Sequence, residues 1–144
     1  MESGKLETAL KRDAAGWARE HLADDVVGWL TTVAPDGTPQ SSVVSFLLEG
    51  ETILVYSQPD TPKLRNIARS PLVSFNLQSD PYGDHILIIE GTAAEDLAVP
   101  PSDEHAAYAA KYREPLEHWG MGEAETARDF SVPIRITPRR VRLV

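Results

Sequence analysis

The chain is organised around residues 53–75, which read ILVYSQPDTPKLRNIARSPLVSF. Their pattern predicts a strand, a polar turn, a short helix, a stop at Pro71 and a second strand. Leu64, Ile67 and Ala68 fall on one face of the predicted helix. The polar positions of that helix are then expected near the mouth of a cleft or on the surface: Lys63, Arg65, Asn66 and Arg69.

The start of this predicted helix has the chemistry of an anion site. Thr61 can cap the helix and Pro62 occupies its first position, so free backbone N–H groups would point at whatever lies beside Lys63. Helix N-termini with this geometry bind phosphate groups. The competing interpretation is a solvated helix between two strands, and both interpretations stay open at this point.

Size and composition predict a single soluble domain over residues 1–144. A chain of 144 residues can bury roughly two-thirds of its unfolded surface. Its hydrophobic content of 42% and charged content of 25% are typical of a globular protein. No apolar run approaches the ~18 residues of a membrane span, and the charged N-terminus does not resemble a secretory signal. The chain has no cysteine, which excludes disulfides and thiolate chemistry and favours the cytoplasm.

The net charge of −8 argues against general binding to nucleic acid or to an anionic membrane. Half of the 14 basic residues nevertheless fall in two short clusters: Lys63, Arg65 and Arg69, and Arg135, Arg139, Arg140 and Arg142. An acidic protein that concentrates its cations in this way is expected to hold a small anion locally. The alternative is that these cations only balance nearby carboxylates.

The first half of the chain predicts one helix and three strands. Residues 5–23 share an apolar helical face. Strands rich in branched and aromatic residues are expected at 27–34, 40–48 and 52–57, and Pro, Asp and Gly at 35–38 are strong turn residues. Connections this short predict an antiparallel meander of the three strands.

The second half predicts three more strands. Val73, Phe75 and Leu77 alternate with polar residues, which indicates a half-buried strand. Residues 85–91 predict another strand, which is apolar on both faces. The last strand begins at residue 132, and its apolar register flips past Pro138, so a bulge or break is expected there.

Two further helical segments complete the prediction. A helix capped by Ser102 is expected over 102–112, and residues 113–129 are expected to form a loop and a short helix. The sum is a mainly β (α+β) fold of six antiparallel strands with three peripheral helices. Closure into a small barrel would protect the edges of such a sheet.

No motif for metal, acyl-transfer or nucleotide chemistry is present. The four histidines are scattered without pairs at ligand spacing, so no metal site is predicted: His21, His85, His105 and His118. The sequence also lacks a Gly-x-Ser-x-Gly elbow and the Gly-rich dinucleotide and P-loop fingerprints. Aromatic residues on the strands could stack bases, but the negative charge makes core packing the better explanation.

The hydroxyl-rich strand 40–46 is the remaining candidate for a site, and it is expected beside the strand that ends at Tyr56 and Ser57. Hydroxyls next to a capped basic turn suit a ligand with a flat ring at one end and a phosphate at the other. The backbone N–H and C=O groups of the strand would form hydrogen bonds with the edge of the ring, and Lys63 would bind the phosphate as a point charge. The alternative is a set of ordinary solvent-facing serines in an edge strand.

These segments resemble a known family. The motif combines LTTVAPDGTP at 30–39 and SPLVS at 70–74 with the pair Tyr56-Ser57, Lys63 and Asn66. It is similar to the pyridoxamine 5'-phosphate oxidase-like split-barrel superfamily, and in particular to the flavin/deazaflavin oxidoreductases of group B, an actinobacterial branch that uses coenzyme F-420 (F420). The match is strong over residues 27–91, and it does not separate F-420 from FMN.

The resemblance implies a homodimeric split β-barrel with two cofactor sites at the subunit interface. Carried over by position, Ser42, Val43 and Val44 line the cofactor ring. The phosphate end is held by five further residues: Ser57, Gln58, Thr61, Lys63 and Asn66. Residues 112–119 or the C-terminal arginines are candidates for closing the site from the other subunit.

The function implied is hydride transfer between reduced deazaflavin and a small unsaturated or carbonyl-containing substrate. The alternatives are an FMN-binding oxidase or reductase of the same fold and a non-catalytic cofactor-carrier or ligand-binding dimer. The cofactor carries the chemistry in such enzymes, so no catalytic side chain is assigned, although Tyr82, His85 and Tyr112 are conceivable proton donors. Pro62 replaces a basic residue of true pyridoxamine-phosphate oxidases, whose C-terminal substrate segment is also missing, so vitamin B6 oxidation is not expected.

Overall fold

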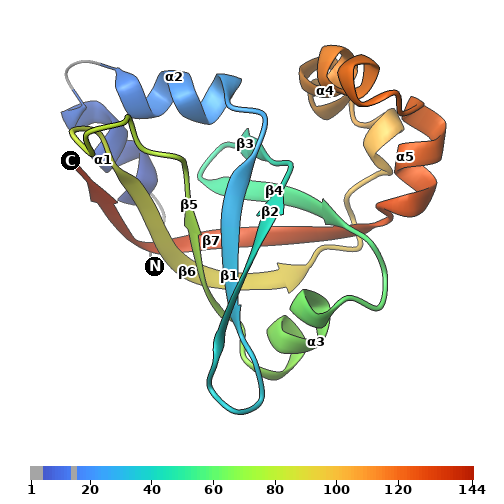
Figure 1. The fold of residues 1–144 in the computed structure, drawn as a ribbon, viewed down its shortest axis with the longest axis horizontal. Coiled ribbons are helices and arrows are strands. Elements are labelled where there is room, and N and C mark those ends of the chain that lie inside the picture. The colour runs from blue at the N-terminus through green and yellow to red at the C-terminus, as the bar shows by residue number, and fades with distance from the viewer. Residues whose placement is uncertain (1–4, 14–15) are drawn as a thin grey trace.

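The structure is a computed structural model that describes residues 5–13 and 16–144. Within that range it contains seven strands, five α-helices and one 3₁₀ helix (Figure 1). The strands are β1 Gly28–Val33, β2 Pro39–Val44, β3 Leu47–Glu49, β4 Thr52–Ser57, β5 Leu72–Asn76, β6 Leu87–Glu95 and β7 Val132–Leu143. The helices are α1 Lys5–Arg12, α2 Trp17–Asp24, α3 Pro62–Arg69, η1 Ser102–Glu104, α4 Ala106–Trp119 and α5 Glu123–Asp129. None of these helices is long and apolar enough to cross a membrane.

The described strands form one antiparallel sheet in the order β2-β1-β5-β6-β7-β4-β3. The sheet curves into a half-barrel, with α1 and α2 at one end, α3 at the opposite side and α4 and α5 beside the end of β4 (Figure 1). The predicted mainly β architecture is confirmed. The predicted count of six strands is wrong, because one expected strand is divided in two.

The division falls at Ser45 and Phe46, inside the segment predicted as one strand over 40–48. The backbone of Phe46 leaves the sheet and pairs with side chains of α4. Its N–H donates to the Tyr112 hydroxyl at 2.8 Å, and its carbonyl accepts from Lys111 Nζ at 2.8 Å. Because these partners replace the strand-to-strand bonds, β2 ends at Val44 and β3 starts afresh at Leu47.

The predicted three-strand meander is also wrong. β1 and β2 form a hairpin, but β2 and β3 lie at the two opposite edges of the sheet. β4 pairs with β3 and with β7, far along the chain. β2 and β4 still approach each other across the curved sheet without a ladder between them, which brings the hydroxyl-rich strand near Tyr56 and Ser57.

The helix predicted over residues 5–23 is two helices, α1 and α2. The second begins after Gly16, whose φ of 72° lies in the left-handed region that favours glycine. Leu6, Leu10 and Ala18 are buried as the predicted apolar face requires. Ala14, which belongs to the same predicted face, lies outside the described residues.

The helix predicted over 102–112 begins later and runs further than expected. Ser102 starts the short η1, and the N-cap of α4 is His105, whose Nδ1 accepts a hydrogen bond from the Tyr108 N–H at 3.2 Å. α4 then continues through Pro115 to Trp119, where a loop was predicted. The described chain therefore has five α-helices where three were expected.

The irregularity expected in the last strand is confirmed. Gly91 of β6 faces Pro138 and Glu90 faces Arg140, so one extra residue of β7 bulges between them. The close approach needs a glycine on the β6 side, because a Cβ atom at position 91 would lie 2.1 Å from the Thr137 carbonyl oxygen.

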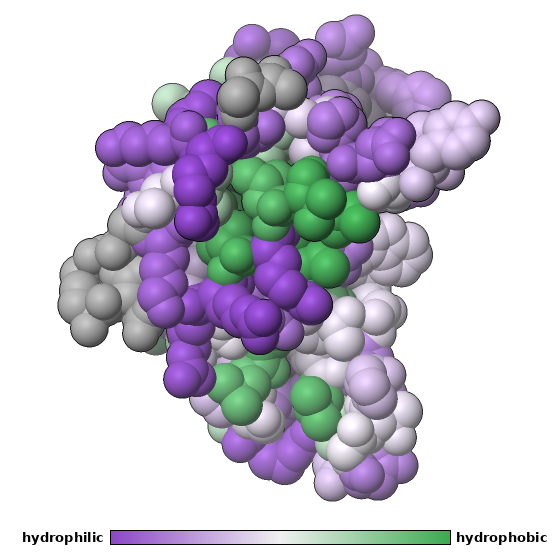
Figure 2. Space-filling view, turned by 90° about the vertical axis from the view of Figure 1, so that its left-hand side faces the viewer, coloured by the Kyte–Doolittle hydropathy of each residue, from purple (hydrophilic) through white to green (hydrophobic). Residues whose placement is uncertain are grey.

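The surface retains several exposed apolar side chains. Trp29 of β1 and Val43 of β2 face each other across the hairpin and are 38% and 49% exposed. On the side where the C-terminus lies, hydrophobic side chains gather at the centre of the face and hydrophilic ones surround them (Figure 2).

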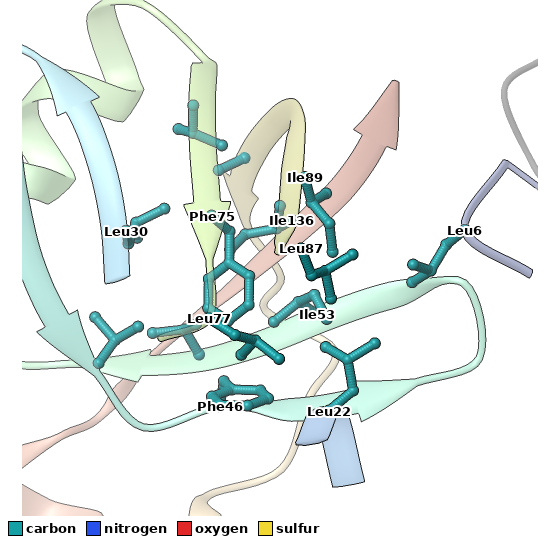
Figure 3. Packing of buried hydrophobic residues seen from close by; sticks show 14 of the residues in the cluster. Leu6, Leu22, Leu30, Phe46, Ile53, Phe75, Leu77, Leu87, Ile89 and Ile136 are labelled. Carbon is teal, nitrogen blue, oxygen red and sulfur yellow. The ribbon is translucent and has the colours of Figure 1, made fainter. Parts of the chain in front are cut away.

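Two hydrophobic cores hold the fold. The larger fills the half-barrel (Figure 3) and includes an edge-to-face pair of Phe46 and Phe75, whose ring centroids are 5.1 Å apart. The predicted burial of Val73 and Leu77 is confirmed there. The smaller core joins β4 to α4: Leu54, Tyr56, Tyr108, Tyr112 and Leu116. The α4–α5 segment thus packs on the sheet through a core of its own.

Candidate functional site

A cavity of about 290 Å³ lies between the sheet and the α4–α5 segment. One side is built by residues at the ends of two strands: Val43, Val44 and Ser45 at the end of β2, and Tyr56, Ser57 and Gln58 at the end of β4. Lys63 of α3 contributes a cation. The opposite side is the helical wall, in which the cavity-lining residues of α4 are Tyr108, Ala109, Tyr112, Leu116 and Trp119.

Lys63 is half-buried and borders two hollows at once. The second hollow, of about 230 Å³, is lined by Ser42, Gln40 and Thr32 on its strand side. Burial lowers the pKa of Lys63 below its ordinary value, because a desolvated ammonium loses hydration. No carboxylate in the described chain forms an ion pair with this lysine, so an anion in either hollow would supply its missing partner.

The start of α3 is placed as predicted, but the predicted cap bond is not made. Thr61 is the N-cap and Pro62 follows it, yet the Thr61 side chain accepts no backbone hydrogen bond from the helix. Its hydroxyl lies 3.3 Å from Ser57 Oγ, and Ser57 donates to the Gln58 carbonyl at 2.9 Å. The Leu64 and Arg65 N–H groups both donate hydrogen bonds to the Thr61 carbonyl. The start of α3 therefore has fewer free N–H donors than the sequence suggested.

Asn66 is buried, which contradicts its predicted place near a cleft mouth or on the surface. It is 3% exposed, and its Nδ2 donates to Thr32 Oγ1 at 3.0 Å and to Gln40 Oε1 at 2.8 Å. It therefore ties α3 to the first hairpin. Ala68, predicted for the buried face, is exposed instead.

Of the eight residues predicted to bind a cofactor, six line one of the two spaces, and Thr61 and Asn66 line neither. Five line the main cavity: Val43, Val44, Ser57, Gln58 and Lys63. Ser42 lines the second hollow together with Lys63, and Thr61 lies beside Ser57 at the start of α3. Asn66 lines neither space. Binding by these residues stays a prediction.

The helical wall is the part of the site that sequence reasoning missed on this chain. Tyr112, Leu116 and Trp119 were assigned to a possible contribution from a second subunit, whereas they line the cavity of their own chain. Tyr108, Tyr112 and Leu116 recur every four residues, a helical apolar stripe that could have placed them on one face.

Two of the three tyrosines that line the cavity donate hydrogen bonds from their hydroxyls to backbone carbonyls. Tyr56 donates to the Pro100 carbonyl at 2.6 Å, and Tyr112 donates to the Val26 carbonyl at 2.6 Å. Burial raises the pKa of both phenols to about 12. The ring of Tyr108 stacks on Tyr112 at 4.7 Å, so the wall presents aromatic faces to the cavity.

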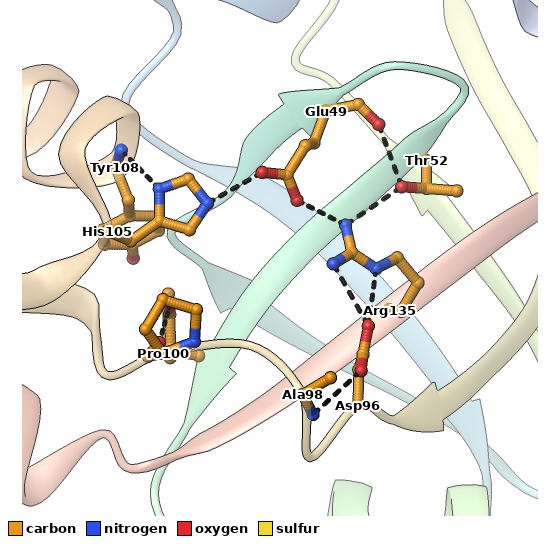
Figure 4. Close-up of polar contacts among 9 residues, drawn as sticks. Glu49, Thr52, Asp96, Ala98, Pro100, His105, Tyr108 and Arg135 are labelled. Atoms are coloured by element: carbon orange, nitrogen blue, oxygen red, sulfur yellow. Dashed lines mark hydrogen bonds and ion pairs between the residues drawn. The ribbon is translucent and has the colours of Figure 1, made fainter.

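A polar cluster fastens the start of α4 to the sheet (Figure 4). Arg135 of β7 donates to Glu49 Oε1 at 2.6 Å and lies 3.1 Å from Asp96, while His105 Nε2 lies 2.7 Å from Glu49 Oε2. The hydrogen bond from Arg135 holds the pKa of Glu49 below its ordinary value, with His105 acting in the same direction against burial.

The C-terminal arginines have carboxylate neighbours. Arg140 and Arg142 lie 3.9 and 3.7 Å from Glu90, and Arg135 belongs to the polar cluster. For these three residues the structure favours the alternative in which the cations balance nearby carboxylates.

The conceivable proton donors named from sequence do not meet at the cavity. Tyr82 is 90% exposed, and His85 stacks on Trp17 at 5.5 Å, outside the cavity lining. Tyr112 lines the cavity with its hydroxyl tied to the backbone. Among the described residues, no group of three or more His, Asp or Glu side chains is placed to hold a metal.

The half-barrel sheet and the cavity at the ends of β2 and β4 define a small split-barrel protein with a ligand-sized site. The family model described as pyridoxamine 5'-phosphate oxidase matches residues 17–144, and the chain belongs to this family. The comparison with curated proteins finds no match.

Solved structures support the fold. A Listeria innocua protein assigned as a pyridoxamine 5'-phosphate oxidase is 26% identical, with a TM-score of 0.64 over 89% of this chain and 95% of that one. An F420 reductase is 26% identical, with a TM-score of 0.57 over 88% and 92%. A heme binding protein from Mycobacterium smegmatis is 26% identical, with a TM-score of 0.61 over 88% of this chain and 52% of that one. Similar folds therefore include redox and heme-binding proteins.

Proposed function

We propose that the protein is an oxidoreductase that uses coenzyme F-420 and transfers a hydride between the reduced cofactor and a small organic substrate. The observation that carries the proposal is Lys63, a half-buried cation without a carboxylate partner in the described chain, placed at the start of α3 and bordering the cavity. The similarity to an F420 reductase supports the choice of cofactor.

The residues around the cavity fit a cofactor with a flat ring and a phosphate. Lys63 supplies the charge, and Ser57 and Gln58 supply hydroxyl and amide groups beside it. Val43 and Val44 give an apolar surface for a ring. When bound, the deazaflavin supplies the hydride chemistry; the chain's residues bind it, orient it and exclude water.

A homodimer in the cytoplasm is part of the proposal, with each cavity completed at the subunit interface. A volume of about 290 Å³ is at the lower end of the ~300–1,000 Å³ of typical ligand pockets, so cofactor and substrate together need additional surface. Val43 lines the cavity and is also exposed beside Trp29 on the outer face of the sheet. A second copy that covers these two residues would bring its surface to the cavity mouth.

FMN is the alternative cofactor, because a lysine at a phosphate does not distinguish the two rings. A non-catalytic carrier is the other alternative, since the charged side chains that line the cavity, Lys63, Asp103 and Glu123, form no ion pair or hydrogen bond with one another among the described residues. Heme binding of the kind named for the Mycobacterium smegmatis protein has less support, because no histidine of the described residues lines the cavity.

The test is a fluorescence titration of the parent and of Lys63→Ala with coenzyme F-420 and with FMN. We expect tight binding of F-420, weakened in Lys63→Ala by about 1.5–3 kcal/mol, the value of a hydrogen bond to a charged group. Arg19→Ala, which removes the same charge from exposed α2, is the control and should bind like the parent.

Three results would change the interpretation. Equal affinity of Lys63→Ala and the parent would contradict the phosphate assignment. Binding of FMN alone would move the protein to the flavin alternative. Binding of F-420 without hydride transfer to any acceptor in a substrate screen would favour the carrier.

A further inference from the structure

Tyr108 differs from its two aromatic neighbours in the cavity. Tyr56 and Tyr112 donate their hydroxyls to backbone carbonyls, whereas Tyr108 makes no hydrogen bond to the backbone through its phenol in the described part of the chain. The Ser45 hydroxyl is its polar neighbour. Burial raises the pKa of Tyr108 beyond its usual range, and Ser45 acts in the opposite direction. The phenol therefore keeps its proton and remains a donor.

Another hydroxyl group of the helical wall belongs to Thr126. Thr126 of α5 lines the cavity, and its Oγ1 is a buried side-chain atom with no hydrogen-bond partner among the described residues. Leaving a buried hydroxyl unsatisfied is costly, and such groups in native structures call for an explanation. This hydroxyl is enclosed by protein atoms, so rotation about the Cα–Cβ bond of Thr126 would bring it to a ligand in the cavity.

The charges around the wall restrict what can bind there. Asp103 and Glu123 line the cavity on the helical side, and Lys63 is the one cation among its described lining residues. The rest of the wall is apolar and aromatic, and it includes the side chains of Leu116 and Trp119. A carboxylate or phosphate would be repelled by Asp103 and more weakly by Glu123, which lies 3.9 Å from Arg113. An uncharged ring would instead bury apolar surface.

We propose that the helical wall is a subsite for uncharged, ring-containing ligands that carry a carbonyl oxygen, and that Tyr108 and Thr126 determine this specificity by donating hydrogen bonds to that oxygen. The inference deepens the proposed function by naming its substrate class. It rests on that function only in calling the bound ligand a substrate. Binding of the carbonyl compound itself needs no cofactor.

The test uses two probes of the same shape. In 2-acetylnaphthalene the ketone oxygen is an acceptor, and in 2-isopropenylnaphthalene a CH₂ group replaces that oxygen. Dissociation constants are measured by NMR titration of the full chain, with and without coenzyme F-420. We expect the parent to prefer the ketone about fivefold, the range that a neutral hydrogen bond supplies.

Matched variants separate recognition from stability. Tyr108→Phe should keep the parent's melting temperature and lose most of the ketone preference, and Thr126→Val should reduce that preference as well. Tyr56→Phe is the control, because its hydroxyl holds the Pro100 carbonyl. It should lower the melting temperature and keep the preference.

The outcomes are decisive for this inference. An unchanged ketone preference in Tyr108→Phe, or no binding of either probe, would overturn it, whatever the cofactor titration gives. If neither F-420 nor FMN binds while the preference still depends on Tyr108, the proposed function falls and the carbonyl subsite stands.

Discussion

Asn66 joins α3 to the first hairpin through two hydrogen bonds from its amide nitrogen, a buried one to Thr32 and a part-buried one to Gln40. We expect Asn66→Asp to lower the free energy of unfolding by about 1–3 kcal/mol. A carboxylate at this position has no N–H to donate, so Thr32 Oγ1 and Gln40 Oε1 lose the donor that they share. Urea denaturation at neutral pH measures the loss.

The matched control for this change is Gln78→Glu, the same amide-to-carboxylate replacement at an exposed position. It should leave the free energy of unfolding close to that of the parent. Equal stabilities of Asn66→Asp and the control would show that the buried amide contributes nothing.

Helical periodicity alone could not have found this role. It predicts which residues share a face, and it placed Ile67 correctly in the core. It also assigned Asn66 to the cleft mouth or surface because asparagine is polar, and Ala68 to the interior because alanine is apolar. The acceptors of Asn66 lie 34 and 26 residues away, and such partners become visible only in three dimensions.

The bulge between β6 and β7 depends on the missing side chain of Gly91. A Cβ atom there would lie 2.1 Å from the Thr137 carbonyl oxygen, and backbone cannot move aside as a flexible side chain can. We expect Gly91→Ala to cost about 3 kcal/mol or more, the upper range for overpacking, as measured by thermal denaturation.

Gly122→Ala is the matched control, since the nearest atom to its added Cβ is 3.9 Å away. Its φ of −78° is allowed for alanine. A Gly91→Ala protein as stable as this control would mean that the bulge can rearrange at little cost.

Helices and strands were predicted correctly where the sequence pattern that defines them is local. The alternation in β5 and the flip in β7 were read correctly from side-chain periodicity. The division between β2 and β3 was missed, because the bonds that Phe46 makes come from Tyr112 and Lys111 on a distant helix. α4 continues past Pro115, since burial of Leu116 compensates for the backbone bond that proline removes.

At the scale of the molecule, Glu49 links β3, β7 and the start of α4 through Arg135 and His105. Arg135 holds the pKa of Glu49 below its ordinary value, so the folded state binds this proton less readily than the unfolded chain. The stabilisation is present above the ordinary glutamate pKa of about 4.3 and is lost as the pH falls below it.

We therefore expect Glu49→Gln to be less stable than the parent at pH 7 and to lose less stability between pH 5 and pH 3, the region around the ordinary pKa of about 4.3. Unfolding by urea over this pH series measures both effects. Glu95→Gln, at an exposed position, should follow the parent. Parallel pH curves for Glu49→Gln and the parent would show that the cluster is not linked to folding.

The order of strands was beyond the reach of the sequence alone. Family resemblance correctly indicated a split barrel, but hairpin rules favoured neighbours in the chain and gave a meander. Pairing of β4 with β7 joins residues as far apart as Ile53 and Ile136. Ser57, a predicted site residue, faces Val132 at the end of this ladder, so its position depends on a pairing that the sequence did not predict.

The two separate cores have a consequence for how the protein can change. The aromatic wall belongs to the smaller core on β4 and α4, while the half-barrel is filled by the larger one. Wall side chains that make no hydrogen bond to the barrel, such as Leu116 and Trp119, can be exchanged without repacking the larger core, whereas Tyr112 holds the backbone of Phe46. Mutation can therefore alter the pocket while the scaffold and Lys63 stay unchanged. Selectivity and foldability are in this way encoded in different parts of one short chain.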